Sequence, residues 1–367
     1  MRYLFIVQGE GRGHLTQAIS LKQMLEHNGH EVVAVMVGKS KKRVLPDFFP
    51  EKMNTEIIQF QSPNFMPMPK GKKPFLLASI LYNILLLPVY IESIFTIRRT
   101  IREQQADIVI NFYELLCGIT YGVFNPEVPM VNMAHQYYFL TSNFEYTGNN
   151  WFKFYLLNLY SRFTAFNSSK ILALSFRRED TGNKGTIGIV PPLLRRELLH
   201  QKSRKGNYML GYLLNDGYMK DLKKWSERNA SEILHFFWDR KNTDTTTIAS
   251  HNLTMHRLND QLFLKLMTGT KAYATTGGFE SVCEAMYMNK PVLMVPTHIE
   301  QECNVMDALR SGAGVAADSF DLDKLLEYIP HHANTNDFKH WVQSAESLIM
   351  FELTETDTTS DTVFAAI

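Results

Sequence analysis

Cysteine is scarce in this sequence. The 367 residues contain three cysteines, Cys117, Cys283 and Cys303, and no two of them form a CxxC pair. This argues against a disulfide scaffold and a zinc ribbon, and it is typical of proteins from reducing compartments. The opening segment MRYLFIVQGEGRGH carries an apolar run that is too short for a signal peptide. We therefore expect a cytoplasmic protein.

An excess of charge of one sign is missing as well. Lys and Arg number 38 against 37 Asp and Glu, which leaves a net charge of +1. Since this balance creates no global field, we expect no nucleic-acid partner. Hydrophobic residues make up 45% and charged residues 20%, as in ordinary folded proteins. A chain of 367 residues exceeds what one core usually covers, so we expect two domains.

No apolar run is long and unbroken enough to make a membrane span the favoured interpretation. The closest segment, Pro74–Ile97, is interrupted by Asn83, Pro88 and Glu92, and three arginines follow within the next five residues. A core helix is the favoured interpretation, a membrane-surface helix comes second and a transmembrane span third. Tyr137–Phe166 holds twelve aromatics in thirty residues. It indicates either core packing or an apolar acceptor groove or membrane contact.

The first forty residues have the order of a βαβ unit. Tyr3–Val7 predicts a buried strand, and the glycine loop Gly9–Gly13 follows it. A helix is predicted from His14 to about residue 27, and Glu31–Val37 predicts the next strand. This order implies a parallel sheet covered on both faces.

The strand and helix rhythm breaks once and then restarts. Segments 106–113 and 128–135 predict later strands of the first sheet, and 191–205 is basic and polar, like a linker. Further strands are predicted at 208–214, 245–250, 271–276 and 291–296. We therefore expect an α/β protein with an N-terminal domain at 1–195, a C-terminal domain at 206–335, and a C-terminal helix with a polar tail at 336–367.

The first glycine loop, QGEGRGH, does not fit the dinucleotide fingerprint. His14 stands where the third glycine belongs, and Gly38 and Lys39 stand where an acid is expected. A nicotinamide or flavin enzyme is therefore disfavoured. The loop still lets a ligand approach the backbone, and the following helix offers N–H groups to anionic oxygens. His14 can act as a general base there, or it is a histidine bonded to the helix backbone.

A second glycine turn follows the predicted strand at 271–276. Gly277 and Gly278 precede a helix that begins near Glu280 or Ser281, an arrangement that suits a diphosphate. Glu284 lies about one turn into this helix, on the face of Ser281. There a carboxylate suits the two hydroxyls of a ribose better than it suits phosphate.

After the next strand, a loop at 297–301 is predicted to return polar groups to the same place. Glu300 and Gln301 offer the hydrogen-bond acceptors and donors that the hydroxyls of a sugar require.

Segment 276–304 resembles the donor-binding signature of GT-B glycosyltransferases. These include the bacterial transferase that adds N-acetylglucosamine to a lipid-linked peptidoglycan precursor, and the nucleotide-sugar glucosyltransferases of plants and animals. The resemblance implies that Thr276 and the glycine turn hold the diphosphate, and that Glu284 binds the ribose. It places Glu300 and Gln301 on the sugar and matches Asn304 to an asparagine of the signature.

The segment GEGRGHLTQA resembles the glycine-rich start of the same superfamily. This implies that His14 is the catalytic base and that Gly11 and Gly13 contribute to donor binding. In the plant enzymes an aspartate orients the base, but the comparable place here reads NFYE, from Asn111 to Glu114. Either Glu114 takes that role, or His14 works without a carboxylate partner. Asn111 and His135 are candidates for acceptor binding.

Together these features predict two Rossmann-like domains that face each other across a cleft. The predicted activity is inverting, metal-independent transfer from a nucleotide diphosphate sugar, first of all a UDP-sugar, with no cofactor. A lipid-linked or hydrophobic acceptor and a peripheral position on the inner face of the membrane are expected. A sugar-nucleotide epimerase and a noncatalytic nucleotide-sugar-binding protein are the alternatives. The Asp321–Asp323 pair is interpreted as a helix cap rather than a metal site, and base recognition is expected near 256–260.

Overall fold

The structure is a computed structural model of the chain. It describes all residues except 42, 65–81, 181–186, 214–215, 240–243 and 359–367. The described residues form two compact units. The first contains the chain up to Arg196 and, in addition, the segment from Gln343 onward, and the second contains Glu197–Val342. Residues 74–81 of the predicted apolar helix and the end of the polar tail lie outside the described residues.

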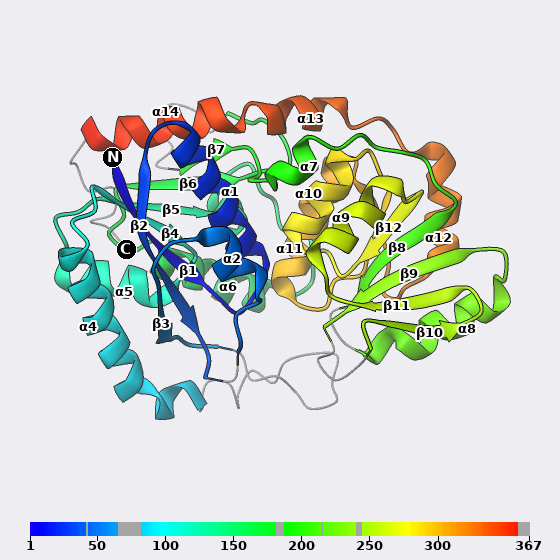
Figure 1. Ribbon diagram of the computed structural model, residues 1–367, viewed down its shortest axis with the longest axis horizontal. Helices are drawn as coiled ribbons and strands as arrows, with labels where there is room; N and C mark the ends of the chain where they lie inside the picture. The colour runs from blue at the N-terminus through cyan, green and yellow to red at the C-terminus, as the bar shows by residue number, and fades with distance from the viewer. Residues whose placement is uncertain (42, 65–81, 181–186, 214–215, 240–243, 359–367) are drawn as a thin grey trace. The chain divides into compact units, whose positions relative to one another are not determined.

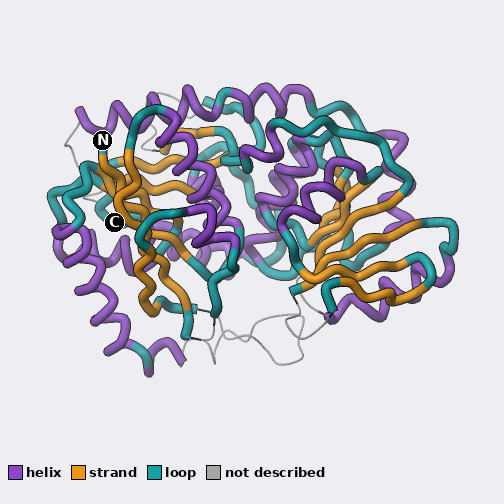
Figure 2. The backbone as a smooth tube through the Cα atoms, viewed as in Figure 1, coloured by secondary structure: helices purple, strands orange, loops and turns teal. Residues whose placement is uncertain are grey.

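The first unit is built around a parallel sheet with helices packed against it (Figures 1 and 2). Its strands are β1 (Arg2–Gln8), β2 (Glu31–Lys39), β3 (Ile57–Gln61), β4 (Ile108–Phe112), β5 (Met130–Ala134), β6 (Lys170–Leu174) and β7 (Ile187–Val190). Its helices are α1 (Gly13–His27), α2 (Phe48–Met53), α4 (Leu87–Glu103), α5 (Leu115–Phe124), α6 (Trp151–Thr164) and α14 (Ala345–Thr358), with a 3-10 helix η1 (His135–Leu140).

The strand order in this sheet is β3-β2-β1-β4-β5-β6-β7. The order reverses direction between β1 and β4, which makes the carboxyl ends of these two strands the expected ligand site of a doubly wound sheet. The strands are buried because they are short runs of apolar residues. Leu4 and Ile6 of β1 pack with Ile97 of α4 and with Leu116 and Tyr121 of α5 in one core cluster. This packing fixes where the strand ends point.

The second unit repeats this plan. Its strands are β8 (Tyr208–Leu213), β9 (Ile233–Trp238), β10 (Thr246–Ser250), β11 (Leu253–Arg257), β12 (Ala272–Thr275), β13 (Val292–Met294) and β14 (Gly314–Ala316). The helices from residue 196 to 343 are α7 (Arg196–Leu199), α8 (Met219–Arg228), α9 (Asp260–Gly269), α10 (Phe279–Tyr287), α11 (Ile299–Arg310), α12 (Leu322–Tyr328) and α13 (Asn336–Gln343), with 3-10 helices η2 (Asp216–Tyr218) and η3 (Ile329–His331).

The second sheet has the order β10-β11-β9-β8-β12-β13-β14. Its pairs are parallel except that the edge strand β10 runs antiparallel to β11. From β8 the chain adds β9 on one side of the sheet, and β12 and the later strands on the other side. The turn after β12 therefore lies at the point where ligands of such sheets bind. The predicted α/β class with two Rossmann-like domains is therefore confirmed.

The last helix, α14, belongs to the first unit. Its residue Glu352 forms an ion pair with Lys170 of β6, and Lys170 also donates to the Glu352 carbonyl over 3.0 Å. Near the start of α14, Glu346 lies 2.6 Å from Nδ1 of His27 at the end of α1. The hydrogen bond from His27 lowers the pKa of Glu346. Helix α14 is therefore tied to the first unit at two places, one on the sheet and one on α1.

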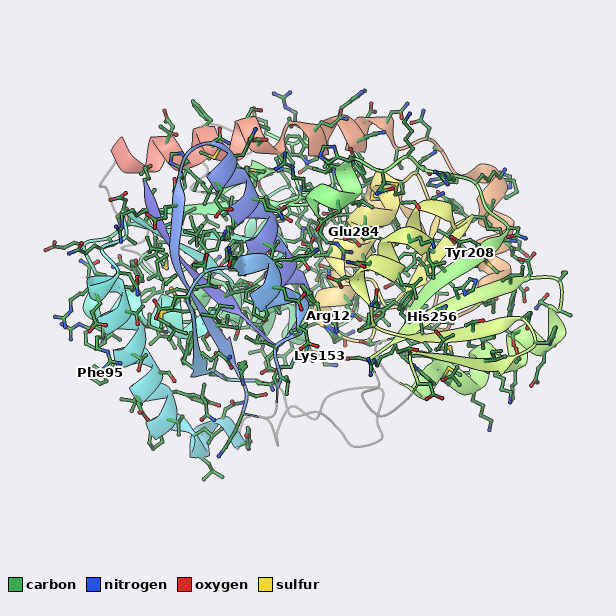
Figure 3. The ribbon with its side chains drawn as sticks, in the orientation of Figure 1. Arg12, Phe95, Lys153, Tyr208, His256 and Glu284 are labelled. Carbon is green, nitrogen blue, oxygen red and sulfur yellow. The ribbon has the colours of Figure 1, made fainter. Side chains whose placement is uncertain are left out.

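Helix α4 contains residues 87–97 of the apolar segment and is amphipathic. Tyr90 and Ile97 are buried in the core, whereas Leu87, Ile91 and Phe95 are each more than half exposed. Figure 3 shows Phe95 on the outer side of this helix. In the described part of the chain, no helix has both the length and the apolar character that a bilayer crossing requires. One face of the helix is therefore core, and the other is an apolar surface.

Candidate active site

The glycine loop of the first unit begins directly after β1. The N–H of Gly9 donates to the Gly38 carbonyl over 2.7 Å, and a Cβ at Gly9 would lie 2.6 Å from Cγ1 of Val37. Gly9 is therefore required for packing against β2. Gly11 is exposed and has nothing within 4 Å of its Cβ position, so ligand can reach the backbone there. Gly13 is the first residue of α1.

His14 lies in the first turn of α1 and is partly exposed. Its Nδ1 is 3.1 Å from Oε1 of Gln17, one turn further along the helix. A carbonyl oxygen only accepts, so Nδ1 carries the hydrogen in this bond, and Nε2 of the neutral ring carries the lone pair. The imidazole also stacks on the ring of Tyr113, with centroids 5.6 Å apart and an interplanar angle of 27°. In the neutral imidazole, this arrangement leaves the Nε2 lone pair for a general base to use.

Tyr113 is the first residue after β4 and has an unusual backbone. Its φ is +60°, in the left-handed region that bulky residues rarely adopt. Such a conformation costs about 1–3 kcal/mol and persists only where the surroundings hold it. The tyrosine hydroxyl is 2.7 Å from Oγ of Ser161, and the ring is buried. No sequence pattern points to this residue, because a backbone angle cannot be read from the letters NFYE.

Glu114 caps α5 and is fully buried. Its Oε1 accepts from Oγ of Ser62 over 2.5 Å and from the N–H of Leu116 over 3.1 Å. In the described chain no hydrogen bond joins it to His14, so the structure provides Gln17 rather than Glu114 as the partner of Nδ1. Burial raises the pKa of Glu114 from its ordinary value of 4.5 to about 7, and the hydrogen bonds from Ser62 and Leu116 oppose the rise.

The two acceptor candidates lie in the core. Asn111 is fully buried; its amide donates to Oδ1 of Asn132 (2.8 Å) and to the carbonyl of Thr164 (2.9 Å). His135 is 1% exposed and its Nδ1 is 2.7 Å from the Leu174 carbonyl. Burial lowers the pKa of His135 to about 3, so this imidazole is neutral. Both side chains are enclosed in the core and hydrogen-bonded there.

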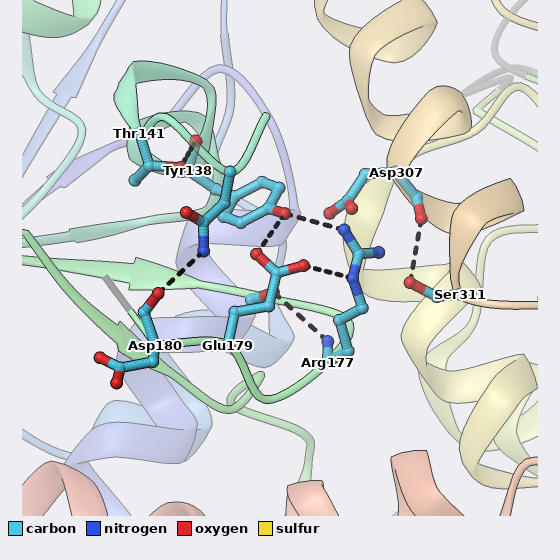
Figure 4. Close-up of polar contacts among 9 residues, drawn as sticks. Tyr138, Thr141, Arg177, Glu179, Asp180, Asp307 and Ser311 are labelled. Atoms are coloured by element: carbon cyan, nitrogen blue, oxygen red, sulfur yellow. Dashed lines mark hydrogen bonds and ion pairs between the residues drawn. The ribbon is translucent and has the colours of Figure 1, made fainter. Parts of the chain in front are cut away.

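A polar cluster lies after β6, at the carboxyl edge of the first sheet. Nη2 of Arg177 donates to the hydroxyl of Tyr138 over 2.8 Å, and this hydroxyl donates to Oε2 of Glu179, also over 2.8 Å (Figure 4). Nε of Arg177 bonds to Oε1 of Glu179. The Glu179 carboxylate therefore compensates the positive charge of the Arg177 guanidinium. No motif in the sequence predicted this cluster.

The glycine turn of the second unit joins β12 to α10. Gly277 has a φ of +83°, and a Cβ there would lie 2.6 Å from Cγ2 of Val305. Gly278 is the N-cap of α10, with an extended backbone and no atom closer to its Cβ position than Oγ of Ser281 at 4.0 Å. The two glycines therefore differ. The fold requires the first, and the second leaves open space at a helix N-terminus, where anions bind.

Gln301 does not lie in a loop, as the sequence predicted, but in the first turn of α11. Its Oε1 accepts from the N–H (3.0 Å) and the hydroxyl (2.8 Å) of Thr297, which closes the turn ahead of the helix. Its Nε2 donates to Oγ1 of Thr276 over 3.1 Å. The amide thus ties the start of α11 to the glycine turn. Glu300, also in the first turn, is partly exposed.

The other predicted donor residues surround the same turn. Nδ2 of Asn304 donates to the Gly277 carbonyl over 3.2 Å, and Oγ of Ser281 donates to the Gly278 carbonyl over 3.3 Å. Glu284 lies on α10 one turn beyond Ser281 and is 3% exposed (labelled in Figure 3). The structure therefore brings the predicted donor residues of this unit together around β12, α10 and the start of α11.

Two further expectations have different outcomes. Asp321 is the N-cap residue of α12, as predicted, but its side chain makes no capping hydrogen bond. His256, in the region predicted to recognise the base, is 6% exposed, and its Nε2 is 3.0 Å from Nδ1 of His235. Burial lowers the pKa of His256 to about 4. The histidine pair is therefore a neutral, packed element of β9 and β11.

Two Rossmann-like units with glycine turns at the carboxyl edges of their sheets define the GT-B class of glycosyltransferases, which the sequence resembles. The model of glycosyl transferase family 1 matches residues 1–330. The chain belongs to this family and is a glycosyltransferase. No curated protein sequence matches it.

Solved structures share the fold over nearly the whole chain. The glycotransferase of kitacinnamycin is 14% identical, with a TM-score of 0.64 over 97% of this chain and 99% of that one. UGT89C1 of Arabidopsis thaliana, crystallised with quercetin, is 13% identical, with a TM-score of 0.63 over 97% and 99%. UGT2 of Phytolacca americana is 11% identical, with a TM-score of 0.63 over 98% and 100%.

The raised pKa of Glu114 predicts a pH-dependent stability. Between pH 4.5 and 7 the folded protein holds a proton that the unfolded chain has released. The stabilising contribution is therefore complete below pH 4.5 and is lost as the pH rises through 7, about 3 kcal/mol in all. We expect Glu114→Gln to remove this dependence, so that the variant gains stability relative to the wild type between pH 5 and 8. Urea unfolding of the wild type and the variant across this pH range measures the difference between their free energies of unfolding. A difference that stays constant with pH would contradict the prediction.

The glycine pair predicts unequal effects of neighbouring substitutions on stability. Gly277→Ala forces a left-handed alanine against Val305, and we expect a loss of about 2 kcal/mol in the free energy of unfolding. Gly278→Ala meets open space at an ordinary φ, so its stability should stay within about 0.5 kcal/mol of the wild type. Chemical unfolding compares the two variants. Equal losses would refute the distinction between these glycines.

Proposed function

We propose that the protein transfers a sugar from a nucleotide diphosphate sugar to an acceptor hydroxyl, with inversion and without a metal ion. The observation that carries the proposal is the glycine turn of the second unit. Around it lie an open helix N-terminus, Thr276, Glu284 and the first turn of α11. UGT2 of Phytolacca americana was crystallised with UDP-2fluoro-glucose, which makes UDP-sugars the first donors to test.

The donor is bound by the second unit in this proposal. The first-turn N–H groups of α10 hold the diphosphate next to Gly278, where nothing fills the space. These N–H groups are preorganised for the charge that develops on the leaving diphosphate, so the step requires no metal. Glu284 accepts from the ribose hydroxyls, Glu300 contacts the sugar, and Gln301 reaches it when its amide leaves Thr297.

The acceptor is activated by His14 of the first unit. Nε2 takes the proton of the acceptor hydroxyl while Nδ1 stays bonded to Gln17. The acceptor oxygen forms a bond to the anomeric carbon, and the bond from this carbon to the diphosphate oxygen breaks. A single displacement inverts the anomeric centre. The proton remains on the imidazole, and the electron pair leaves with the nucleoside diphosphate.

A panel of labelled UDP-sugars tests the activity. We expect release of free nucleoside diphosphate that depends on an acceptor, no epimerised donor, and no loss of rate in EDTA. His14→Ala should retain donor binding, measured by calorimetry, and lower kcat by about 10²–10⁴-fold. Epimerised donor without nucleotide release would favour the epimerase, and binding without either product would favour the noncatalytic protein. Unchanged turnover in His14→Ala would remove His14 from the mechanism.

A lipid-linked or hydrophobic acceptor, used at the inner membrane face, is the second part of the proposal. The α4 surface consists of the exposed apolar residues of this helix followed by its arginines, namely Leu87, Ile91, Phe95, Arg98, Arg99 and Arg102. Phe95 contacts Phe124 of α5, and the guanidinium of Arg98 lies 4.3 Å from the centroid of the same ring. An apolar stripe that runs into cations is complementary to anionic lipid headgroups above an acyl layer.

Vesicle sedimentation tests the α4 surface without any donor. We expect binding to vesicles of anionic phospholipid, weaker binding to purely zwitterionic vesicles, and about a tenfold loss for Phe95→Ser. Phe351→Ser on α14 is the matched control, because Phe351 is 59% exposed and Phe95 is 54% exposed. Equal binding of both variants, or no preference for anionic lipid, would contradict this assignment and leave the transfer activity untouched.

A further inference from the structure

The turn after β4 is held by buried hydrogen bonds on both sides of Tyr113. Oδ1 of Asn111 accepts from the N–H of Glu114 over 2.9 Å, and Nδ2 of Asn111 donates to the Glu114 carbonyl over 3.2 Å. Glu114 in turn accepts from the N–H of Leu116. Asn111 and Glu114 are both fully buried. Because these bonds fix the backbone around it, Tyr113 stays in the left-handed region despite its bulk.

This backbone conformation carries the Tyr113 ring to His14. The two rings stack with centroids 5.6 Å apart, and the far end of the tyrosine is fixed by the 2.7 Å bond between its hydroxyl and Ser161. Tyr137 and Tyr160 also pack against the Tyr113 ring, with centroids 5.6 and 5.4 Å away. The ring that faces the imidazole is therefore held at its backbone, at its hydroxyl and at its edges.

His14 is thus restrained in two ways that complement each other. Gln17 bonds to Nδ1 and so determines which nitrogen carries the lone pair. Tyr113 covers one face of the imidazole and so determines the plane in which Nε2 points. An aromatic face also attracts a cation, so it favours the imidazolium that forms when the base takes a proton.

We propose that Tyr113 is the positioning residue of the base: its stacked ring holds His14 in the reactive orientation, the role that a carboxylate would otherwise fill. This inference rests on the proposed function, in which His14 is the base. It explains why a tyrosine is kept in an unfavourable backbone conformation at the point where the sheet order reverses.

Substitutions that keep or remove the aromatic face test the proposal. We expect Tyr113→Phe to retain kcat within about threefold, and Tyr113→Leu to lower it by about tenfold to a hundredfold, with the donor KM unchanged. Tyr121→Leu is the matched control. Tyr121 is also buried, its hydroxyl makes one bond, to the Val128 carbonyl, and its ring lies on α5 within the core. This control should lose stability but keep kcat at a temperature where it is folded.

A double-mutant cycle with His14→Ala decides whether the effect passes through the base. If Tyr113 positions His14, Tyr113→Leu should lower kcat in the wild type and change it less than twofold in the His14→Ala background. The same loss in both backgrounds would overturn the inference while leaving His14 as the base. Unchanged turnover in His14→Ala alone would overturn the base assignment, and the positioning role with it.

A second variant serves if Tyr113→Leu does not fold. Tyr113→Asn fits the left-handed backbone, since asparagine adopts it more readily than other residues, but it removes the ring. Its kcat should fall as in Tyr113→Leu. The NMR signals of the His14 ring protons should also lose the ring-current shift that the wild type and Tyr113→Phe share. Full activity of Tyr113→Asn, or His14 signals that do not move, would overturn the proposal.

Discussion

Several candidate site residues of both units owe their positions to one constraint of parallel sheets. A strand that is followed by a parallel neighbour requires a helix to carry the chain back, so helix N-termini collect at the carboxyl edge of the sheet. In the first unit this rule places His14 after β1 and Glu114 after β4. In the second it places Gly278 after β12 and Gln301 after β13. These candidate residues therefore lie at helix starts, where unpaired N–H groups and partial positive charge are already present.

Buried amide side chains hold these helix starts in place. Asn111 connects β4, the turn after it and the neighbouring strand through Asn132. Gln301 connects the start of α11 to Thr276 in the glycine turn. An amide offers both donors and an acceptor without a charge, so one side chain can bridge two backbone segments at a low cost of burial. Residues that the sequence suggests as ligand contacts therefore also stabilise the fold through these hydrogen bonds.

Local features of the sequence predicted much of this architecture. Apolar runs bounded by glycine or proline placed β1, β8, β12 and β13, because a short buried strand and its turn are encoded by adjacent residues. Strand β9 was not predicted, since its short run of mostly apolar residues fits a buried helix equally well. The start of α11 was missed because His298 at its N-cap is not a favoured capping residue. Ser62 binds Glu114 from 52 residues away, a pairing that only the folded sheet creates.

The docking of α14 makes the first unit discontinuous in sequence. Its sheet ends at β7, an edge strand that α14 contacts, and Lys170 of β6 is neutralised from the same helix. A fragment cut at the end of the first segment would leave that edge uncovered and would be prone to aggregate with other copies. Chimeric enzymes built to exchange acceptor or donor specificity therefore have to transfer the C-terminal helix together with the N-terminal half, because the two form one folded unit.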